Sequence, residues 1–135
     1  MEKYCVGVDV GGTTVKLGLF QTDGKLIFKW EIPTRKEDSG KYILEDVSVA
    51  VREVLRERQI HLEQVVGVGL GVPGPVLPDG QVERCVNLGW HNVNPQSQLS
   101  SFLDGILVKS GNDANVAALG EMWQGGGMGF TGIIM

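Results

Sequence analysis

The stretch GVDVGGTTVKLGLF, Gly7 to Phe20, decides how this chain folds, because two glycines interrupt two runs of strand-forming residues. A P-loop needs the spacing G-x-x-x-x-G-K-[ST]; Gly7 and Gly12 have it, but Thr13 stands where the lysine belongs. A Rossmann loop opens a helix, whereas the residues after Gly12 alternate as a strand. A strand–turn–strand unit remains, with Asp9 at the end of its first strand.

Such a turn can direct backbone N–H groups and threonine hydroxyls at a phosphate. Asp9 beside it would offer an oxygen ligand to the Mg²⁺ that accompanies ATP, directly or through water. The alternative is an ordinary Gly-Gly hairpin with a solvated aspartate, but an acidic strand end before G-G-T-T favours the phosphate site. The predicted ATP-binding residues are Asp9, Gly11, Gly12, Thr13, Thr14 and Lys16.

The residues around this unit predict an α/β fold. Runs of β-branched residues predict strands over 4–10, 15–20, 26–32, 65–72 and 106–109, with a hairpin turn at Asp23-Gly24. Pro33 and the polar residues after it are expected to form a loop over 33–40. From 41 to 58 the apolar period becomes 3.6, which predicts an amphipathic helix. Its inner face is expected to hold Ile43, Leu44, Val47, Val51, Val54 and Leu55. We therefore expect a mixed sheet, in which three antiparallel-connected strands are followed by alternating helices and strands.

The second half is punctuated by proline and glycine over 73–92, so we expect a long ordered loop there with a short hairpin. Asn94 is expected to cap a helix that starts at Pro95 and stops at Gly105. The residues predicted to face inward from it are Leu99, Phe102 and Leu103. A further helix is predicted over 114–123, and TGIIM at 131–135 begins another strand. That strand either opens a second domain or closes a small one as a short edge.

The string GLGVPG, Gly69 to Gly74, has the letters of a dinucleotide-binding loop but not its structure. Pro73 and Pro75 forbid the helix that such a loop must open. A rigid turn at the end of a buried strand remains, a common place for a ligand-binding loop. Glycines alternate along that strand and let a helix or a ligand approach the backbone. They are Gly67, Gly69 and Gly71.

A third polar turn, GNDAN from Gly111 to Asn115, has two interpretations. Asn112 or Asp113 can cap the helix that follows. Alternatively, amides and a carboxylate together suit the hydroxyls of a sugar, and a carboxylate there can accept the proton of a hydroxyl that attacks a γ-phosphate. The motif by itself does not decide between cap and catalyst.

Composition excludes several functional classes. The chain has 135 residues, of which 42% are hydrophobic and 21% charged, with a net charge of −4. This balance is typical of one globular domain, and interspersed charges argue against a nucleic-acid or anionic-membrane surface. No apolar run approaches the roughly 18 residues that cross a bilayer, and no signal peptide precedes the first strand. Cys5 and Cys85 form no metal or disulfide motif, so we expect a cytoplasmic protein.

Three segments in this order and spacing, GVDVGGTTVKLGLF, GVGLGVPGPV and GNDANVAALGE, together resemble the N-terminal half of the ROK family. This family comprises bacterial sugar kinases and related repressors, and the resemblance is greatest to its glucokinases. It extends over essentially the whole chain, including VNLGW and EMWQGGG. It implies a ribonuclease-H-like domain of the actin-like ATPase superfamily. It also implies transfer of the γ-phosphate of ATP to a hexose hydroxyl, usually O6, with Mg²⁺.

The resemblance also assigns residues by position. DVGGTT is similar to the family's first phosphate motif, which supports ATP and magnesium at Asp9 and the turn after it. NDAN resembles the sugar and catalytic motif, which makes Asp113 the general base on the sugar O6 and Asn112 a ligand of a sugar hydroxyl. Asn87, in VNLGW, is either a sugar contact or a turn residue. The residues implied to bind the hexose are Gly71, Pro73, Gly74, Asn87, Asn112 and Asp113.

Other family parts, including a second phosphate loop, an adenosine pocket and a zinc motif, would lie beyond Met135. We therefore expect 1–123 to be the N-terminal domain and 124–135 a glycine-rich linker and the start of a second domain, with little or no activity for the chain alone.

Repressors carry a DNA-binding segment before this domain, and only MEK precedes the first strand. The competing hypothesis is a sugar-binding regulatory domain without catalysis. Glucose is the favoured hexose, although N-acetylmannosamine, fructose and allose kinases share these motifs. A homodimer is compatible with the resemblance.

Overall fold

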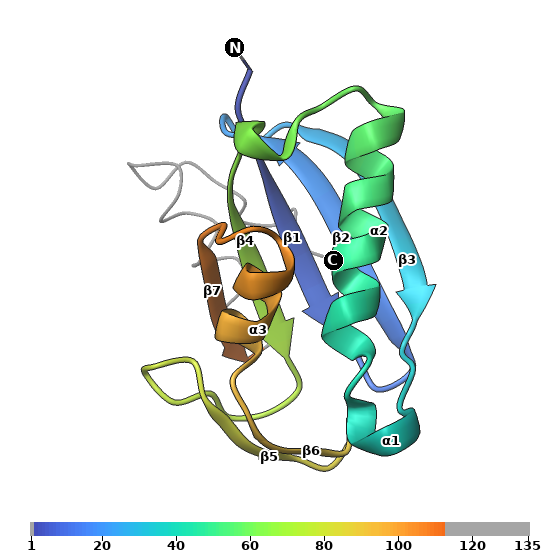
Figure 1. Cartoon of the computed structure of the whole chain (residues 1–135), viewed down its shortest axis with the longest axis vertical. Helices are drawn as coiled ribbons and strands as arrows, with labels where there is room; N and C mark the ends of the chain where they lie inside the picture. Colours follow the sequence, from blue (N-terminus) through green and yellow to red (C-terminus); the bar gives the residue numbers. More distant parts are fainter. Residues whose placement is uncertain (1, 113–135) are drawn as a thin grey trace.

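The computed structural model describes residues 2–112, which begin with three consecutive strands (Figure 1). These strands, β1 (Tyr4–Val10), β2 (Thr14–Gln21) and β3 (Leu26–Pro33), pair antiparallel in sequence order. At the turn between β2 and β3, the Gly24 N–H donates to the Gln21 carbonyl at 2.9 Å, and Gly24 has a φ of 94°. Glycine adopts this left-handed conformation without a steric penalty, so the hairpin predicted at Asp23-Gly24 is confirmed.

Two further strands, β4 (Val65–Val72) and β7 (Val108–Asn112), complete the main sheet of the described residues in the order β3-β2-β1-β4-β7. β4 runs parallel to β1, and β7 runs parallel to β4. Parallel neighbours need long crossover connections, and helices α2 (Ile43–Glu57) and α3 (Pro95–Phe102) lie in them. The predicted mixed α/β sheet is confirmed.

Helices α2 and α3 lie on the same face of the sheet and pack against each other (Figure 1). The six residues predicted to form the inner face of α2 are all buried. They meet apolar side chains from the covered face of the sheet, and together these form the core. The central strands contribute Val6, Val8, Val10, Leu17, Leu19, Val68 and Leu70.

The start of α3 matches the prediction, but its inner face does not. Asn94 caps it by accepting a hydrogen bond from the Ser97 N–H at 3.0 Å, with Pro95 in the first turn. Leu99 and Leu103 are fully buried, whereas Phe102 is 39% exposed. The prediction for Phe102 was wrong because the helix ends there. Leu99 and Leu103, one helical turn apart, already fill the space facing the core.

The last strand begins later than predicted. Residue 106 was expected in a strand, but β7 runs from Val108 to Asn112. The reason is the exit turn of α3: the Gly105 N–H donates to the Ser100 carbonyl at 2.8 Å, and the Ser100 hydroxyl donates to the Ile106 carbonyl at 2.6 Å. These bonds hold residues 105 and 106 in the helix terminus, as in other glycine-ended helices. Asn112 lies in β7 rather than in a loop.

A second, two-stranded sheet of β5 (Val82–Cys85) and β6 (Trp90–Val93) confirms the short hairpin predicted between 73 and 92. A short 3₁₀ turn, η1 (Leu62–Gln64), leads into β4. The segment 33–40 was predicted to be a loop throughout, but it contains one turn, α1 (Glu37–Gly40), in which Asp38 and Ser39 have φ of 53° and 62°. The predicted helix over 114–123 and the final strand lie outside the described residues.

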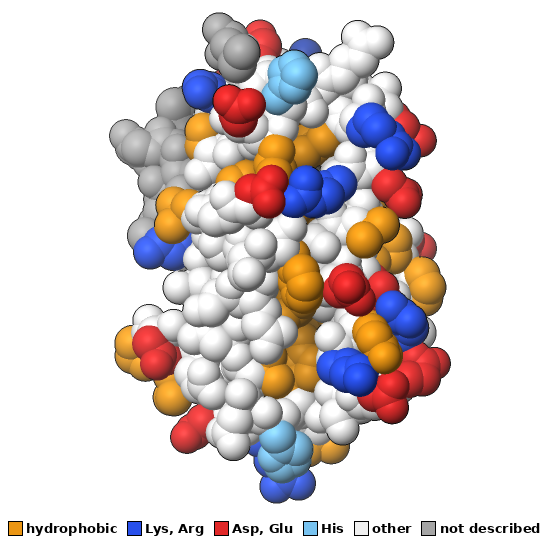
Figure 2. Space-filling model, viewed as in Figure 1, with side chains coloured by type: hydrophobic (Ala, Val, Ile, Leu, Met, Phe, Trp, Pro, Cys, Tyr) orange, Lys and Arg blue, Asp and Glu red, His pale blue; other side chains and the backbone are white. Residues whose placement is uncertain are grey.

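The surface over α2 and α3 carries acidic and basic side chains side by side, without a large patch of one sign (Figure 2). Some hydrophobic side chains reach this surface between the two helices (Figure 2). Val49, Phe102 and Leu107 are among the exposed apolar residues. No helix within the described part of the chain is long and apolar enough to cross a bilayer.

Candidate active site

The three parallel strands β1, β4 and β7 end at the same edge of the sheet. Asp9 on β1 is the register partner of Gly71 on β4, and Gly71 is the partner of Gly111 on β7. On the other side, Asp9 faces Lys16 on β2. Because register partners lie directly opposite one another, this row joins three of the segments singled out from the sequence. The carboxyl ends of parallel strands are a usual location for ligand sites in α/β sheets.

The turn between β1 and β2, residues 11–14, is compact and leaves no room for a side chain at its first position. The Gly11 N–H donates to the Thr14 carbonyl at 3.0 Å. A Cβ atom on Gly11 would lie 2.8 Å from the same carbonyl oxygen, closer than real contacts allow. Glycine is therefore required here by a close backbone approach, and the turn opens no helix. Both features agree with the predicted strand–turn–strand unit.

Thr34, which directly follows β3, forms two hydrogen bonds to this turn. Its hydroxyl donates to the Gly11 carbonyl at 2.8 Å, and its backbone N–H donates to the Thr13 carbonyl at 2.9 Å. Sequence reasoning missed this residue, because it assigned 33–40 to an unremarked loop. A threonine after a proline at a strand end gives no signal of such a contact, which depends on how the sheet folds.

The loop after β4 is tied to the small second sheet. The Gly74 N–H donates to the Val72 carbonyl at 2.9 Å, which makes a tight turn centred on Pro73. The Cys85 thiol lies 3.7 Å from the Pro73 carbonyl, and a Cβ on Gly74 would stand 3.7 Å from that sulfur. The predicted sugar loop, Gly71 to Gly74, is thus positioned at the sheet edge by both β4 and β5.

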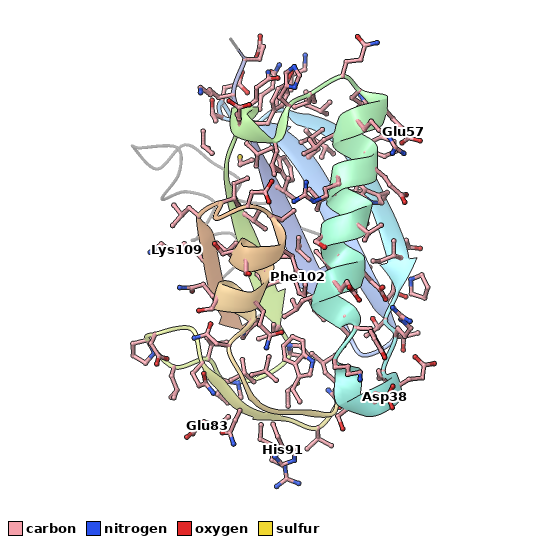
Figure 3. The ribbon with its side chains drawn as sticks, viewed as in Figure 1. Asp38, Glu57, Glu83, His91, Phe102 and Lys109 are labelled. Carbon is pink, nitrogen blue, oxygen red and sulfur yellow. The ribbon has the colours of Figure 1, made fainter. Side chains whose placement is uncertain are left out.

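Asn87 lies in the turn between β5 and β6 and comes close to the β1–β2 turn. A Cβ placed on Gly12 would be 3.7 Å from the Asn87 Cβ, an ordinary van der Waals distance. Asn87 itself is exposed. It is therefore a turn residue that also lies beside the β1–β2 turn. The outward side chains of the same hairpin, Glu83 and His91, point away from the body of the molecule (Figure 3).

Asn112 is the register partner of Val72, one residue beyond the Gly71–Gly111 pair. This places its backbone at the same edge as Asp9. Asp113, the predicted general base, lies outside the described residues. Of the predicted site residues, the structure therefore brings together the β1–β2 turn, Asn87, the Gly71–Gly74 loop and the backbone of Asn112.

The side chains at this edge suit Mg²⁺ that is bound together with nucleotide phosphates better than a metal ion held by protein ligands alone. Within residues 2–112, no three His, Cys, Asp or Glu side chains are grouped to hold a metal ion. Asp9, half-buried near the end of β1, is a carboxylate beside the β1–β2 turn. Mg²⁺ is commonly held by one or two carboxylates together with the phosphates of a nucleotide, so one aspartate at this position is suitable.

The two cysteines, Cys5 and Cys85, are buried thiols. Burial raises the pKa of Cys5 to about 12, because the thiolate form would lose its hydration. Cys5 is the second residue of β1, remote in sequence from the 11–14 turn that follows the end of the strand at Val10. It is therefore an inert core thiol.

Comparison with known proteins identifies the family. The sequence profile of the ROK family matches residues 5–135. This chain belongs to the ROK family. It is 38% identical to the glucokinase of Halalkalibacterium halodurans over 135 residues, which cover 99% of this chain and 41% of that protein. The chain thus spans about two-fifths of the length of that relative.

Solved ROK structures share the fold. A ROK glucokinase from Streptomyces griseus, in complex with glucose and AMPPNP, superposes with a TM-score of 0.71 at 27% identity, covering 92% of this chain and 38% of that one. A ROK transcriptional regulator homologous to E. coli MLC has a TM-score of 0.69 at 17% identity, covering 82% and 28%, and shows the fold alone. The neighbours include ROK sugar kinases of the actin-like ATPase fold, so the predicted fold class is confirmed.

Proposed function

We propose that this chain is the N-terminal domain of an ATP-dependent hexose kinase, with glucose as the favoured substrate and glucose 6-phosphate as the product. One observation carries the proposal: the phosphate loop after Asp9 and the sugar loop from Gly71 to Gly74 lie at one edge of the sheet, on adjacent parallel strands. A phosphoryl transfer enzyme must bring its nucleotide phosphates and its acceptor hydroxyl to one place. The glucokinase relative and the ROK structure that holds glucose and AMPPNP support the same function.

At this edge the chain's residues have separate tasks. The backbone N–H groups of the 11–14 turn and the Thr13 and Thr14 hydroxyls hold phosphate oxygens, and Lys16, opposite Asp9, adds positive charge. Asp9 would hold Mg²⁺, which neutralises charge on the phosphates when bound. Gly71, Pro73, Gly74, Asn87 and Asn112 bind the hexose.

Asp113, which follows Asn112 in the chain, is the proposed general base. Its carboxylate accepts the proton of the sugar O6 hydroxyl while that oxygen forms a bond to the γ-phosphorus. The bond between the γ-phosphorus and the bridging oxygen to the β-phosphate breaks, and ADP leaves with that electron pair. The products are the sugar 6-phosphate, ADP and one proton on Asp113.

The domain boundaries belong to this proposal. Residues 1–123 form the ribonuclease-H-like domain, and 124–135 lead into a second domain that supplies the rest of the nucleotide site. The relative that matches over two-fifths of its own length supports this division. Activity then requires both domains, because a cleft must close over the substrates to exclude water. A reducing cytoplasm, where two free cysteines persist, is the proposed location, and a homodimer is the proposed assembly.

The test uses the complete gene product and measures ADP formation with glucose, fructose, N-acetylmannosamine and allose in turn. The expected result is hexose-dependent turnover that is fastest with glucose. Replacing Asp113→Asn should lower kcat by about 10²–10⁴-fold and leave the Kd for the hexose within about twofold. Asp23→Asn is the matched control, since Asp23 lies in the exposed β2–β3 hairpin and its Oδ1 accepts a hydrogen bond from the nearby Lys25 N–H.

The second candidate function is sugar-responsive regulation without catalysis, which a putative xylose repressor of Caldicellulosiruptor, 30% identical to this chain over 122 residues, suggests. This function predicts hexose binding with no turnover in the unaltered protein. It also predicts that Asp113→Asn leaves every measured property except sugar affinity unchanged. Either result with a folded protein would remove the kinase proposal.

A further inference from the structure

Thr34 contacts the phosphate loop through two hydrogen bonds that no other described residue duplicates. Its hydroxyl donates to the Gly11 carbonyl at 2.8 Å, and its N–H donates to the Thr13 carbonyl at 2.9 Å. Thr34 is half-buried and follows the last residue of β3, Pro33. It therefore holds two alternate carbonyl groups of the 11–14 turn on its own side of the loop.

Because the peptide bond is planar, these two hydrogen bonds also fix the direction of N–H groups on the opposite side of the turn. In a trans peptide the C=O of one residue and the N–H of the next point in opposite directions. The structure has no cis peptide bond in the described residues. Because the carbonyls of Gly11 and Thr13 point at Thr34, the N–H groups of Gly12 and Thr14 point away from it. Fixing two carbonyls thus aims two donors, which is what a phosphate-binding turn requires.

The residues that follow Thr34 are anchored to α2 and β6. The Arg35 guanidinium binds the Asp46 carboxylate of α2 at 2.7 and 3.0 Å and lies 4.3 Å above the Tyr42 ring. Further along, the Gly40 carbonyl accepts the buried Trp90 Nε1–H at 3.0 Å. The turn between these anchors, where Asp38 is labelled in Figure 3, lies beside the β5–β6 hairpin. The segment from Thr34 to Gly40, which we call the strap, therefore joins the phosphate loop to α2 and β6.

We propose that Thr34 is a positioning residue for nucleotide binding: it makes no contact with ATP, but it orients the Gly12 and Thr14 N–H groups toward the phosphates. This inference rests on the proposed function, because the ligand of the turn is the ATP of that reaction. The hydroxyl carries the specific part of the effect, since any residue at 34 except proline would retain the N–H bond. The Thr34 side chain thus contributes to nucleotide binding in addition to following the end of β3.

The experiment compares Thr34→Val with Thr34→Ser in the complete gene product. Valine keeps the shape of threonine and removes the hydroxyl, whereas serine keeps the hydroxyl. We expect Thr34→Val to raise the Kd for Mg-AMPPNP, measured by calorimetry, and the KM for ATP by roughly three- to tenfold, the effect of one hydrogen bond. The KM for the hexose should stay within about twofold, and Thr34→Ser should restore both nucleotide constants. Thr22→Val, in the remote β2–β3 hairpin, is the matched control.

A purely structural role for Thr34 would give a different result. Thr34→Val would then lower the Tm while leaving the nucleotide Kd equal to that of the unaltered protein, and this would overturn the inference. If Thr34→Val does not fold, Thr34→Ala, which places no methyl group against the Gly11 carbonyl, is measured against the same criteria. Absence of hexose-dependent ADP formation in the unaltered protein would refute the proposed function instead. AMPPNP affinity would still test Thr34 in that case, and an absence of AMPPNP binding would overturn both.

Discussion

At the scale of single residues, the β1–β2 turn depends on the absence of a side chain at Gly11. Gly11 is excluded from carrying a side chain by the Thr14 carbonyl, whereas Gly12 has ordinary space beside Asn87. Asp9 and Gly11 to Thr14 could be singled out from sequence, because an acidic strand end and a helix-less glycine turn are local features. Thr34 could not, because its two bonds span 21 and 23 residues and exist only once β2 and β3 have paired.

The first prediction compares alanine at the two glycines of the turn. Gly11→Ala should lower the free energy of unfolding by about 1–3 kcal/mol, because the new Cβ must displace a backbone carbonyl. Gly12→Ala should cost less, since its Cβ would meet Asn87 at 3.7 Å. Urea unfolding of both variants measures this difference. Equal losses would mean that the turn adjusts freely and does not hold the geometry described.

At the scale of elements, the sequence predicted a helix or strand well where its apolar residues repeat over a long, regular stretch. The inner face of α2 was predictable because six apolar residues repeat at the helical period over four turns. The start of β7 was not, because Ile106 looks like a strand residue but belongs to the exit turn of α3 through its bond from Ser100. The turn at Asp38 and Ser39 was also missed, since non-glycine residues rarely adopt positive φ and their sequence gives no sign of it.

The second prediction concerns the bond between β6 and the strap. Trp90→Phe should reduce the free energy of unfolding by about 1–3 kcal/mol, because it leaves the Gly40 carbonyl without its buried donor. Trp30→Phe is the matched control: the Trp30 Nε1 is buried and has no acceptor among the described residues, so its removal should cost less. Denaturant unfolding followed by circular dichroism tests the order. A larger loss for Trp30→Phe would show that the bond to Gly40 contributes little.

At the scale of the whole molecule, the sheet order explains why segments far apart in sequence lie at one edge of the sheet. Asp9, Gly71 and Gly111 come together only because β1, β4 and β7 are parallel neighbours. The motifs predicted three ligand-binding turns, and the pattern of strands and helices predicted a mixed sheet. The order of strands within the sheet, and the approach of Asn87 to Gly12, required the structure.

The third prediction is a loss of stability at alkaline pH. Burial raises the pKa of Cys5 to about 12, well above its ordinary value near 9, so the folded state holds this proton more tightly than the unfolded state. The stabilisation is therefore complete below about pH 9 and is lost as the pH rises toward 12. Thermal unfolding between pH 8 and 11 should show a shallower decline for Cys5→Ala, whatever its stability at pH 8. Parallel declines would mean that Cys5 is not the titrating group.

The measurement that tests the central claim most directly is a crystal structure of the complete gene product with glucose and AMPPNP. We predict that the phosphates lie within hydrogen-bond distance of the N–H groups of the 11–14 turn. We also predict that the hexose lies between the Gly71–Gly74 loop and Asn112, with its O6 against Asp113. Nucleotide bound away from the β1–β2 turn, or a hexose distant from the ends of β4 and β7, would contradict the account.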